Sequence, residues 1–456
     1  MKQPTQIITG DIRRSAVALI ILAILALGFG MRLKMVRETE VDTPIRMDAV
    51  DYYFYAYNLL RHGVFSRQTS ATNISVRQKP VPDAYRNPGY SLFLLAFVEF
   101  PPTPKMIRHI GVTQAVISTL TILIAFGFLR SFLSRLWALA ASMMVAISPH
   151  LIVFDIYMLT ESLFTFFMVL VAYLMKKVVT NKTGGWSMMT GIGLGCALLI
   201  RPTLMYFIFF LIPVFFIFFK RTQALRLLTF LIIGFAITYG PWIVRNLVTL
   251  KTMSDSSLAA VTVQVGMYPG AMYRNMPESC GAPQKFDPDF DSNRSMSSVL
   301  KLILERFSNE PLRHIRWYLI GKPLTFFSWK TMLLGNNDIF VYPVLTSPYH
   351  HDRMFRCTYQ VMHALHWPLI IFALFSSILV WFPSAHKVFS DEAIIISRFC
   401  SLLLMYFVLV HMAVTPTPRY SVPLRPFIYG MGMLGLSISI TTVSRWFSGK
   451  SFSQES

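Results

Sequence analysis

The sequence is poor in charge, and acidic residues are especially scarce. Charged residues make up 14% of the 456 positions and hydrophobic ones 54%, and the mean hydropathy is +0.51. A soluble protein of this length needs more charge to cover its surface, so the shortage argues against an ordinary soluble domain. The 42 Lys and Arg outnumber the 22 Asp and Glu, giving a net charge of +20. In so apolar a chain this excess fits cytoplasmic loops and anionic lipid headgroups, and we expect no nucleic-acid partner.

Cysteine is also scarce, with four residues in the chain. Cys196 and Cys400 fall in apolar stretches and are expected to be small core residues. Cys280 and Cys357 lie in or beside a long polar segment and could pair in an oxidising compartment. Two candidates do not make a disulfide framework. The sequence further lacks an internal repeat, which many secondary transporters contain.

Long apolar stretches are what the sequence does contain. A helix needs about 20 residues to cross a hydrocarbon core about 30 Å thick. We therefore predict an all-α integral membrane protein with about ten transmembrane helices, or about 11–13 if short apolar segments also cross. The predicted spans are 15–33, 106–129, 133–149, 153–175, 184–200, 203–219, 227–248, 360–383, 394–415 and 426–444.

The basic residues between the predicted spans set the topology. Every short loop that falls inside under this count carries Lys or Arg, as the positive-inside rule requires. Both termini are therefore predicted to be cytoplasmic, in a multi-pass protein of the inner (plasma) membrane. The basic residues of the inside segments are Arg130, Arg135, Lys176, Lys177, Lys182, Lys220, Arg221, Arg226, Lys387, Arg445 and Lys450.

Two long outer segments divide the chain into three parts. Residues 1–248 form a predicted N-terminal transmembrane catalytic module with a first outer loop at 34–105. Residues 249–359 form a large outer loop, and residues 360–456 form the C-terminal transmembrane helices.

Short segments within the outer loops are candidates for helices that lie in the membrane interface. Residues 50–60, 89–100 and 311–329 are apolar or amphipathic and rich in aromatic side chains. Such segments usually lie in the interface plane, so all three are predicted to be juxtamembrane helices. For 89–100 a tilted further span is the alternative.

Asp48 opens the aromatic segment of the first outer loop. A carboxylate at a helix N-terminus is stabilised by the helix dipole and stays ionised, so it can take a proton from a hydroxyl group. Aspartate is also a common cap at helix starts. The residue alone therefore leaves a catalytic and a structural role open.

Motifs at four places along the chain carry a family resemblance. They are DAVDYYFYAYNLLRHGVFS at 48–66 with RNPGYSLFL at 86–94, PHLIVFDIYMLTESLF at 149–164, LLIRP at 198–202 and PRYSVPLRP at 418–426. Their content and order resemble the C-type glycosyltransferases, polytopic membrane enzymes. Within these, the chain is most similar to the bacterial branch that resembles protein mannosyltransferases and the aminoarabinose transferase of lipid A. The resemblance extends over about residues 10–445.

The resemblance implies roles for three acidic residues. Asp48 matches the catalytic Asp, the base that takes the proton of the acceptor. Position 49 is Ala where many relatives have Glu, and Asp51, one helical turn from Asp48, is the candidate to compensate. Glu161 matches the second acidic position and is expected to hold the acceptor, a metal or the basic residues around the phosphate.

The leaving group calls for cations. A polyprenyl phosphate leaves as an anion that needs no proton, so catalysis should rest on positive charge aimed at its oxygens. Arginine suits this task because its planar fork binds phosphate through two hydrogen bonds and keeps its charge. Arg201 and Arg419, at outer ends of spans, are the first candidates, and Arg86 and Lys79 are the others. Anchoring to lipid headgroups is the competing role.

The resemblance therefore implies a sugar transferase at the outer membrane face. We expect transfer from a polyprenyl-phosphate-linked donor to an envelope glycan, lipid or protein, with inversion and an Asp base. A divalent metal is compatible with this reading but not required by it. The alternatives are a transporter or flippase for an anionic lipid-linked substrate, and a non-catalytic subunit of an envelope-synthesis complex. Neither the sugar nor the acceptor follows from the sequence.

Overall fold

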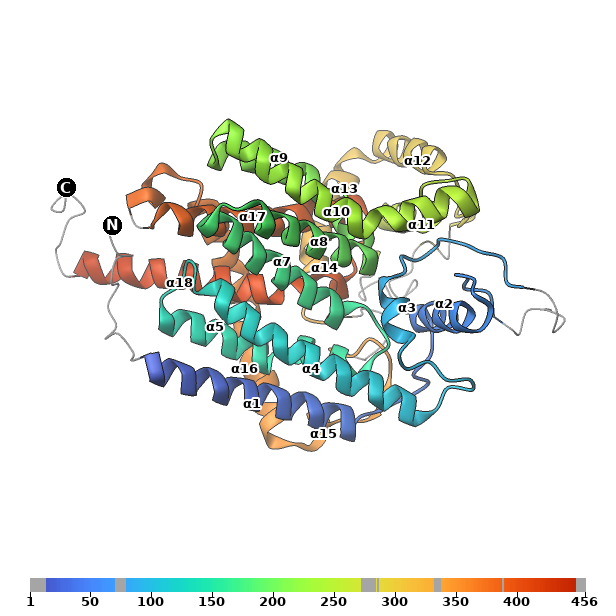
Figure 1. Ribbon diagram of the computed structural model, residues 1–456, viewed down its shortest axis with the longest axis horizontal. Helices are drawn as coiled ribbons and strands as arrows, with labels where there is room; N and C mark the ends of the chain where they lie inside the picture. Colours follow the sequence, from blue (N-terminus) through green and yellow to red (C-terminus); the bar gives the residue numbers. More distant parts are fainter. Residues whose placement is uncertain are drawn as a thin grey trace.

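The computed structural model describes residues 14–69, 79–271, 284, 287–331, 338–387 and 389–447. Its long helices run side by side (Figure 1). The proposed Cys280–Cys357 pair lies outside the described residues because Cys280 does.

Each predicted span corresponds to a helix, which confirms the all-α membrane fold. Helices α6 and η1, described below, adjoin α5, and η6 (Pro418–Leu424) precedes α18. Within the described residues, seven helices are long and apolar enough to cross a membrane, and an eighth is counted if α5, α6 and η1 form one bent span. Helices α8 and α9 are apolar but shorter, with 17 and 12 residues. The helices are α1 (Arg14–Glu38), α4 (Pro104–Leu129), α5 (Arg135–Ile147), α7 (Glu161–Asn181), α8 (Gly184–Ile200), α9 (Phe207–Phe218), α10 (Arg221–Leu250), α16 (Arg353–Leu379), α17 (Asp391–Ala413) and α18 (Arg425–Phe447).

The predicted start of the span at 153–175 is wrong. Residues 149–160 form α6 (Pro149–Val153), η1 (Phe154–Ile156) and a turn, and α7 begins only at Glu161. The apolar residues of this turn made it look like part of a span, but they are buried inside the bundle. The chain bends by 43° between α5 and the α6–η1 pair, where Pro149 follows an extended Ser148. The turn places Glu161, the first residue of α7, in the interior of the bundle.

Glycine allows α8 and α10 to approach each other closely. A Cβ atom at Gly191 of α8 would lie 2.0 Å from the Leu231 carbonyl oxygen of α10, and one at Gly234 would lie 2.1 Å from the Met188 carbonyl oxygen. Gly191 and Gly195 form a GxxxG pair, the pattern that brings helix backbones together in membranes. The contact fixes the end of α8, which leads into Arg201.

We expect Gly191→Ala to destabilise the protein by about 1–3 kcal/mol, because the added methyl group overpacks this contact. Gly185→Ala in the same helix is the matched control, since a Cβ there meets nothing within 4 Å. Thermal unfolding in detergent measures both changes. Equal melting temperatures for the two variants would contradict the close packing of α8 and α10.

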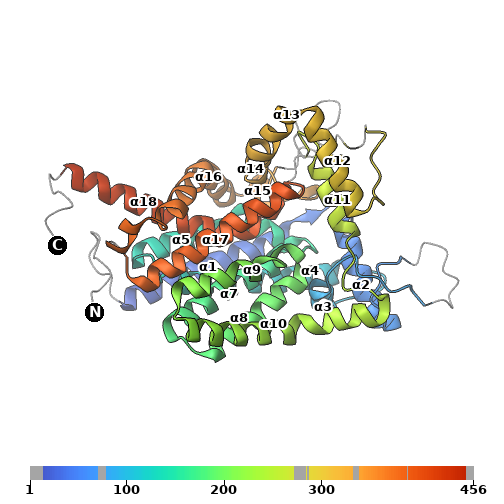
Figure 2. The same ribbon diagram turned by 90° about the horizontal axis from the view of Figure 1, so that it is seen from above.

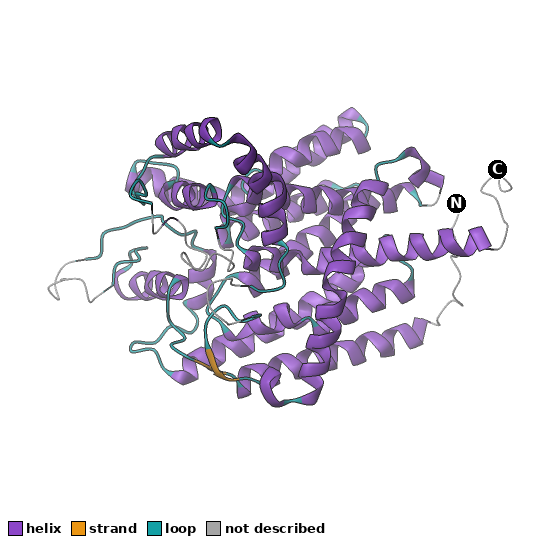
Figure 3. Cartoon of the chain, turned by 180° about the vertical axis from the view of Figure 1, so that it is seen from behind, coloured by secondary structure: helices purple, strands orange, loops and turns teal. Residues whose placement is uncertain are grey.

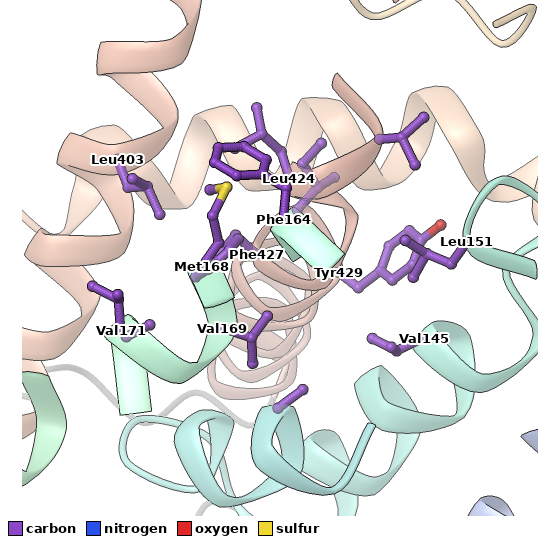
Figure 4. Close-up of a cluster of buried hydrophobic side chains, with 14 of the residues drawn as sticks. Val145, Leu151, Phe164, Met168, Val169, Val171, Leu403, Leu424, Phe427 and Tyr429 are labelled. Atoms are coloured by element: carbon purple, nitrogen blue, oxygen red, sulfur yellow. The ribbon is translucent and has the colours of Figure 1, made fainter. Parts of the chain in front are cut away.

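The buried core joins α7 to the C-terminal helices. Phe164 and Met168 of α7 lie beside Leu403 of α17 and beside Leu424 and Phe427, at the junction of η6 and α18 (Figure 4). These apolar contacts hold the first turn of α7, which begins with Glu161, against the segment that contains Arg419.

The described parts of the two segments predicted to lie outside, 34–105 and 249–359, gather at one end of the bundle. They lie opposite the end where α1 begins and α18 ends (Figures 1 and 2). Strand β1 (Glu40–Val41) pairs antiparallel with β2 (Val344–Thr346), which joins the first predicted outer loop to the second (Figure 3). The helices here are α2 (Asp48–His62), α3 (Gly89–Leu94), α11 (Ser257–Gly266), α12 (Met296–Asn309), α13 (Pro311–Arg316), η4 (Trp317–Gly321), α14 (Lys322–Phe326) and α15 (Pro348–His351).

All three segments predicted as juxtamembrane helices contain helix. Residues 50–60 fall in α2, and 311–329 contain α13, η4 and α14. Only Gly89–Leu94 of the 89–100 segment is α-helical, and six residues reach about 9 Å. The alternative of a tilted span there is therefore wrong.

Candidate active site

Asp48 is the first residue of α2, and its carboxylate is shared by two arginines. Nη2 of Arg86 donates to Asp48 Oδ1 at 2.7 Å, and Nη2 of Arg419 donates to Oδ2. Arg86 also donates through Nε to Asp51 Oδ2 at 3.0 Å. Asp48 follows Met47, whose φ of 49° is unusual for a residue other than glycine. The turn at Met47 thus aims the N-terminus of α2, with its acids, at the arginines.

The network continues from Arg419 into the bundle. Nε of Arg419 lies 3.8 Å from Glu161 Oε1, and Nη2 of Arg201 contacts the same oxygen at 2.5 Å. Arg201 Nε donates to the hydroxyl of Thr160 at 2.7 Å. Three acids and three arginines from four distant parts of the sequence therefore form one continuous network. They are Asp51, Arg86, Asp48, Arg419, Glu161 and Arg201, in the order of contact.

Proline and glycine place the arginines locally. Pro202 follows Arg201, which takes an extended conformation with φ −141° and ψ 130° just after α8, as expected for a residue before proline. A Cβ at Gly89 would lie 2.7 Å from the Leu199 backbone, and Asn87 Nδ2 donates to the Leu198 carbonyl at 2.6 Å. Glycine thus lets the segment that follows Arg86 pack against the end of α8, beside Arg201.

A second ion pair, between Arg32 and Asp155, is linked to the start of α7, where Glu161 lies. Arg32 and Asp155 are fully buried, with Nε of Arg32 3.4 Å from Asp155 Oδ2. The hydroxyl of Ser162, which follows Glu161, donates to Asp155 Oδ1 at 2.6 Å. Arg32 also donates to the carbonyls of Val145 and Ala146 at the end of α5 (3.1 and 2.8 Å). The pair therefore holds the broken end of α5 and the start of α7 together.

Sequence reasoning missed Arg32, Asp155 and Thr160. Arg32 lies near the end of an apolar run, and a charged residue buried within a membrane segment is by default paired or functional. That signal could have identified Arg32, but its partner 123 positions away in the sequence could not be read from spacing.

Aromatic rings cover the arginines. The guanidinium carbons of Arg201 and Arg419 lie 5.1 and 5.3 Å from the ring centre of Tyr420, and that of Arg86 lies 5.5 Å from Tyr52. Tyr342 is buried, and its hydroxyl group has no hydrogen-bond partner among the described residues. Rings over cations add attraction and exclude water, which strengthens the electrostatics of the network.

The surroundings move the pKa values of the two acids of α2 in opposite directions. Burial disfavours ionisation of Asp48, but the charges of Arg419 and Arg86 outweigh it and hold the pKa of Asp48 well below its usual range. Burial raises the pKa of Asp51, and Arg86 offsets this only in part. Asp48 is therefore firmly ionised in this arrangement.

Six of the seven predicted site residues belong to this network of acids and arginines, and Lys79 does not. Lys79 is exposed, and no described ion pair or hydrogen bond links it to the network. Among the described residues no group of three or more His, Cys, Asp or Glu is arranged to hold a metal. Of the three roles expected for Glu161, the contacts described correspond to holding the basic residues.

A buried lysine fixes the end of α17, which leads towards Arg419. Nζ of Lys322 donates to the carbonyls of Met412 and Val414 at 2.7 and 3.2 Å, and it lies 3.6 Å from the ring centre of Tyr318. Burial lowers the pKa of Lys322 to about 7.

This shift makes stability depend on pH. Above pH 7 the unfolded chain, with a lysine pKa of about 10.4, binds more protons than the folded one, so stability rises with pH up to about pH 10, by at most about 1.4 kcal/mol per unit. We expect Lys322→Met to flatten this rise in thermal unfolding scans. Lys301→Met, at an exposed position, should leave it unchanged. A rise that persists in Lys322→Met would show that Lys322 is not its source.

One family model matches part of the chain, and solved structures share its fold. Residues 110–250, which include Glu161 and Arg201, match the family model of dolichyl-phosphate-mannose-protein mannosyltransferases. Among solved structures, the archaeal oligosaccharyltransferase AglB from Archaeoglobus fulgidus, in complex with an inhibitory peptide and a dolichol-phosphate, matches 96% of this chain with 13% identity and a TM-score of 0.50. The match covers 52% of the archaeal chain, so this chain spans about half its length.

A further match is ArnT from Cupriavidus metallidurans bound to undecaprenyl phosphate. It is 13% identical, with 97% of this chain and 82% of ArnT covered and a TM-score of 0.39. No curated protein matches the sequence. The family match over residues 110–250 and the shared fold bear out the resemblance to C-type glycosyltransferases.

Proposed function

We propose that this protein transfers a sugar from a polyprenyl-phosphate-linked donor to an acceptor at the outer face of the inner (plasma) membrane. The observation that carries the proposal is the network of three arginines and three acids at the end of the bundle where the outer segments gather. The arginines supply cations for a leaving phosphate, and Asp48 supplies a carboxylate for the acceptor. The acceptor is an envelope glycan, a lipid or a protein.

The chemistry assigned to the site has two parts. Asp48 takes the proton from the acceptor hydroxyl or amine, which attacks the anomeric carbon from the face opposite the phosphate and so inverts its configuration. Arg86, Arg201 and Arg419 stabilise the phosphate as it leaves. Base catalysis of this kind contributes about 10²–10⁴ in rate, and the remainder must come from positioning and stabilisation of the phosphate charge.

Topology supports the assignment to the outer face. The end of the bundle opposite the site carries the basic segments around α5, α8 and α10, which the positive-inside rule places in the cytoplasm. The first residue of α1 and the last of α18 lie at that end. Both termini are therefore assigned to the cytoplasm and the site to the periplasm or cell exterior.

Glycan analysis in a deletion strain tests the function. We expect loss of one envelope glycan modification together with a build-up of its lipid-linked sugar on the outer leaflet, both reversed by the wild-type gene. A transporter or flippase predicts instead that the lipid-linked sugar builds up on the inner leaflet. A non-catalytic subunit predicts that variants of Asp48 restore the glycan as well as the wild type does.

A further inference from the structure

The resting contacts of Asp48 conflict with its role as a base. A good general base has a pKa near the working pH, whereas two guanidinium groups hold this carboxylate firmly ionised. Each of its oxygens already accepts a hydrogen bond from an arginine. Asp48 can accept a proton only after these two arginines have bound another anion in its place.

Both arginines have a second anchor that keeps them in place without Asp48. Arg86 also contacts Asp51, at 3.0 Å, and Arg419 also lies 3.8 Å from Glu161. Protonation of Asp48 would therefore free one N–H donor on each arginine without releasing either side chain from the site. The two freed donors would lie where Asp48 now binds, beside the proposed position of the phosphate.

The charges of the reaction fit such an exchange. As the acceptor atom bonds to the anomeric carbon, the bond from that carbon to the phosphate oxygen breaks and its electron pair stays on the phosphate. The proton of the acceptor goes to Asp48. The phosphate thus gains one negative charge while Asp48 loses one, so the total charge facing the arginines is constant.

We propose that Arg86 and Arg419 exchange partners: when the donor binds, both arginines release the Asp48 carboxylate and bind the donor phosphate instead. Phosphate binding thus frees Asp48 to accept the acceptor's proton. This inference rests on the proposed function and adds an order to it: the donor phosphate binds before the acceptor is deprotonated. The arrangement also keeps Asp48 inactive as a base when no donor is bound.

Other titratable groups face Asp48 and must be separated from it in any test. Asp51 is the nearest competitor, because it shares Arg86 and has a similar side-chain exposure, 21% against 22%. The charged and titratable groups around Asp48 are Asp51 and Tyr52 of α2, Arg86, Glu161 of α7, Arg201, Tyr342 and Arg419.

Proton uptake on binding of polyprenyl phosphate tests the exchange without catalysis. Calorimetric titration in buffers of different ionisation enthalpy gives the number of protons bound with the ligand. We expect the wild type to take up about one proton more than Asp48→Asn at the same pH, because Asp48 is the group that becomes protonated. Protons exchanged by the ligand itself are common to both proteins and cancel. Asp48→Asn should also bind the phosphate at least about tenfold more tightly, because its arginines are already free.

Asp51→Asn is the matched control and should take up as many protons as the wild type. Equal uptake by the wild type and Asp48→Asn would overturn the exchange, and so would loss of uptake in Asp51→Asn alone. If Asp48→Asn does not fold, the infrared band of a protonated carboxyl group in the wild type, appearing when phosphate is added, is the readout. An unchanged infrared spectrum despite binding would overturn the exchange. Absence of binding by every protein would overturn the proposed donor class, and the exchange with it.

Discussion

Asp48→Asn should lower the rate of glycan transfer by at least about 10²-fold, and up to about 10⁴-fold, the usual contribution of a general base. Asparagine has nearly the same shape but cannot accept the proton of the acceptor. The measurement is the rate of glycan transfer in membranes of the deletion strain, with matched amounts of each protein. The lipid-linked donor should accumulate in the variant.

Asp51→Asn is the comparison for this result, because it removes a carboxylate from the same face of α2. It breaks the contact of Arg86 with Asp51 but leaves Asp48 paired with Arg419, so a smaller loss is expected. A thermal unfolding scan of each variant separates loss of activity from loss of fold. Full activity in a folded Asp48→Asn protein would remove Asp48 as the base and favour Asp51 or the transporter alternative.

Arg419→Lys should lower the turnover rate by about 10²–10³-fold, the usual cost of removing one donor that stabilises charge in the transition state. Lysine keeps the positive charge but lacks the planar fork, through which Arg419 can stay beside Glu161 while another N–H faces Asp48 or, after the exchange, the phosphate. The backbone should stay in place, because the Arg419 N–H donates to the Thr331 carbonyl at 3.2 Å. Turnover at saturating donor concentration is the quantity to measure.

Arg398→Lys provides the control for this substitution. Arg398 lies in α17, donates to the Val380 carbonyl at 2.8 Å and packs near Trp381, away from the acid–arginine network. Its replacement costs packing and should leave turnover within about twofold of the wild type. If Arg419→Lys were as active as Arg398→Lys, positive charge alone would suffice and the shared planar contact would have no catalytic role.

Much of the candidate site could be predicted because the motifs that carry the family resemblance contain its residues. Asp48 is the first residue of an aromatic helix. Arg201 follows an apolar run and precedes a proline, and Arg419 follows a proline after another apolar run. Charged residues at the ends of apolar runs are expected near the membrane surface, and the count of spans predicts the outer side for these.

The pairing within the site could not be predicted, because it depends on tertiary packing. Arg419 contacts Asp48 across 371 positions of sequence, and no periodicity carries that information. The turn before Glu161 was also misplaced, since a buried turn and a membrane span are both apolar. Lys79 has the right charge but is exposed and outside the network, and charge alone could not show this.

The most direct test of the account is reconstitution of the purified protein in vesicles with a radiolabelled polyprenyl-phosphate sugar and membranes of the deletion strain as acceptor. The account predicts that free polyprenyl phosphate and labelled acceptor form in equal amounts, and that both form at least about 10²-fold more slowly with Asp48→Asn. Movement of the intact labelled donor across the vesicle membrane, without release of polyprenyl phosphate, would contradict a transferase and identify a lipid transporter.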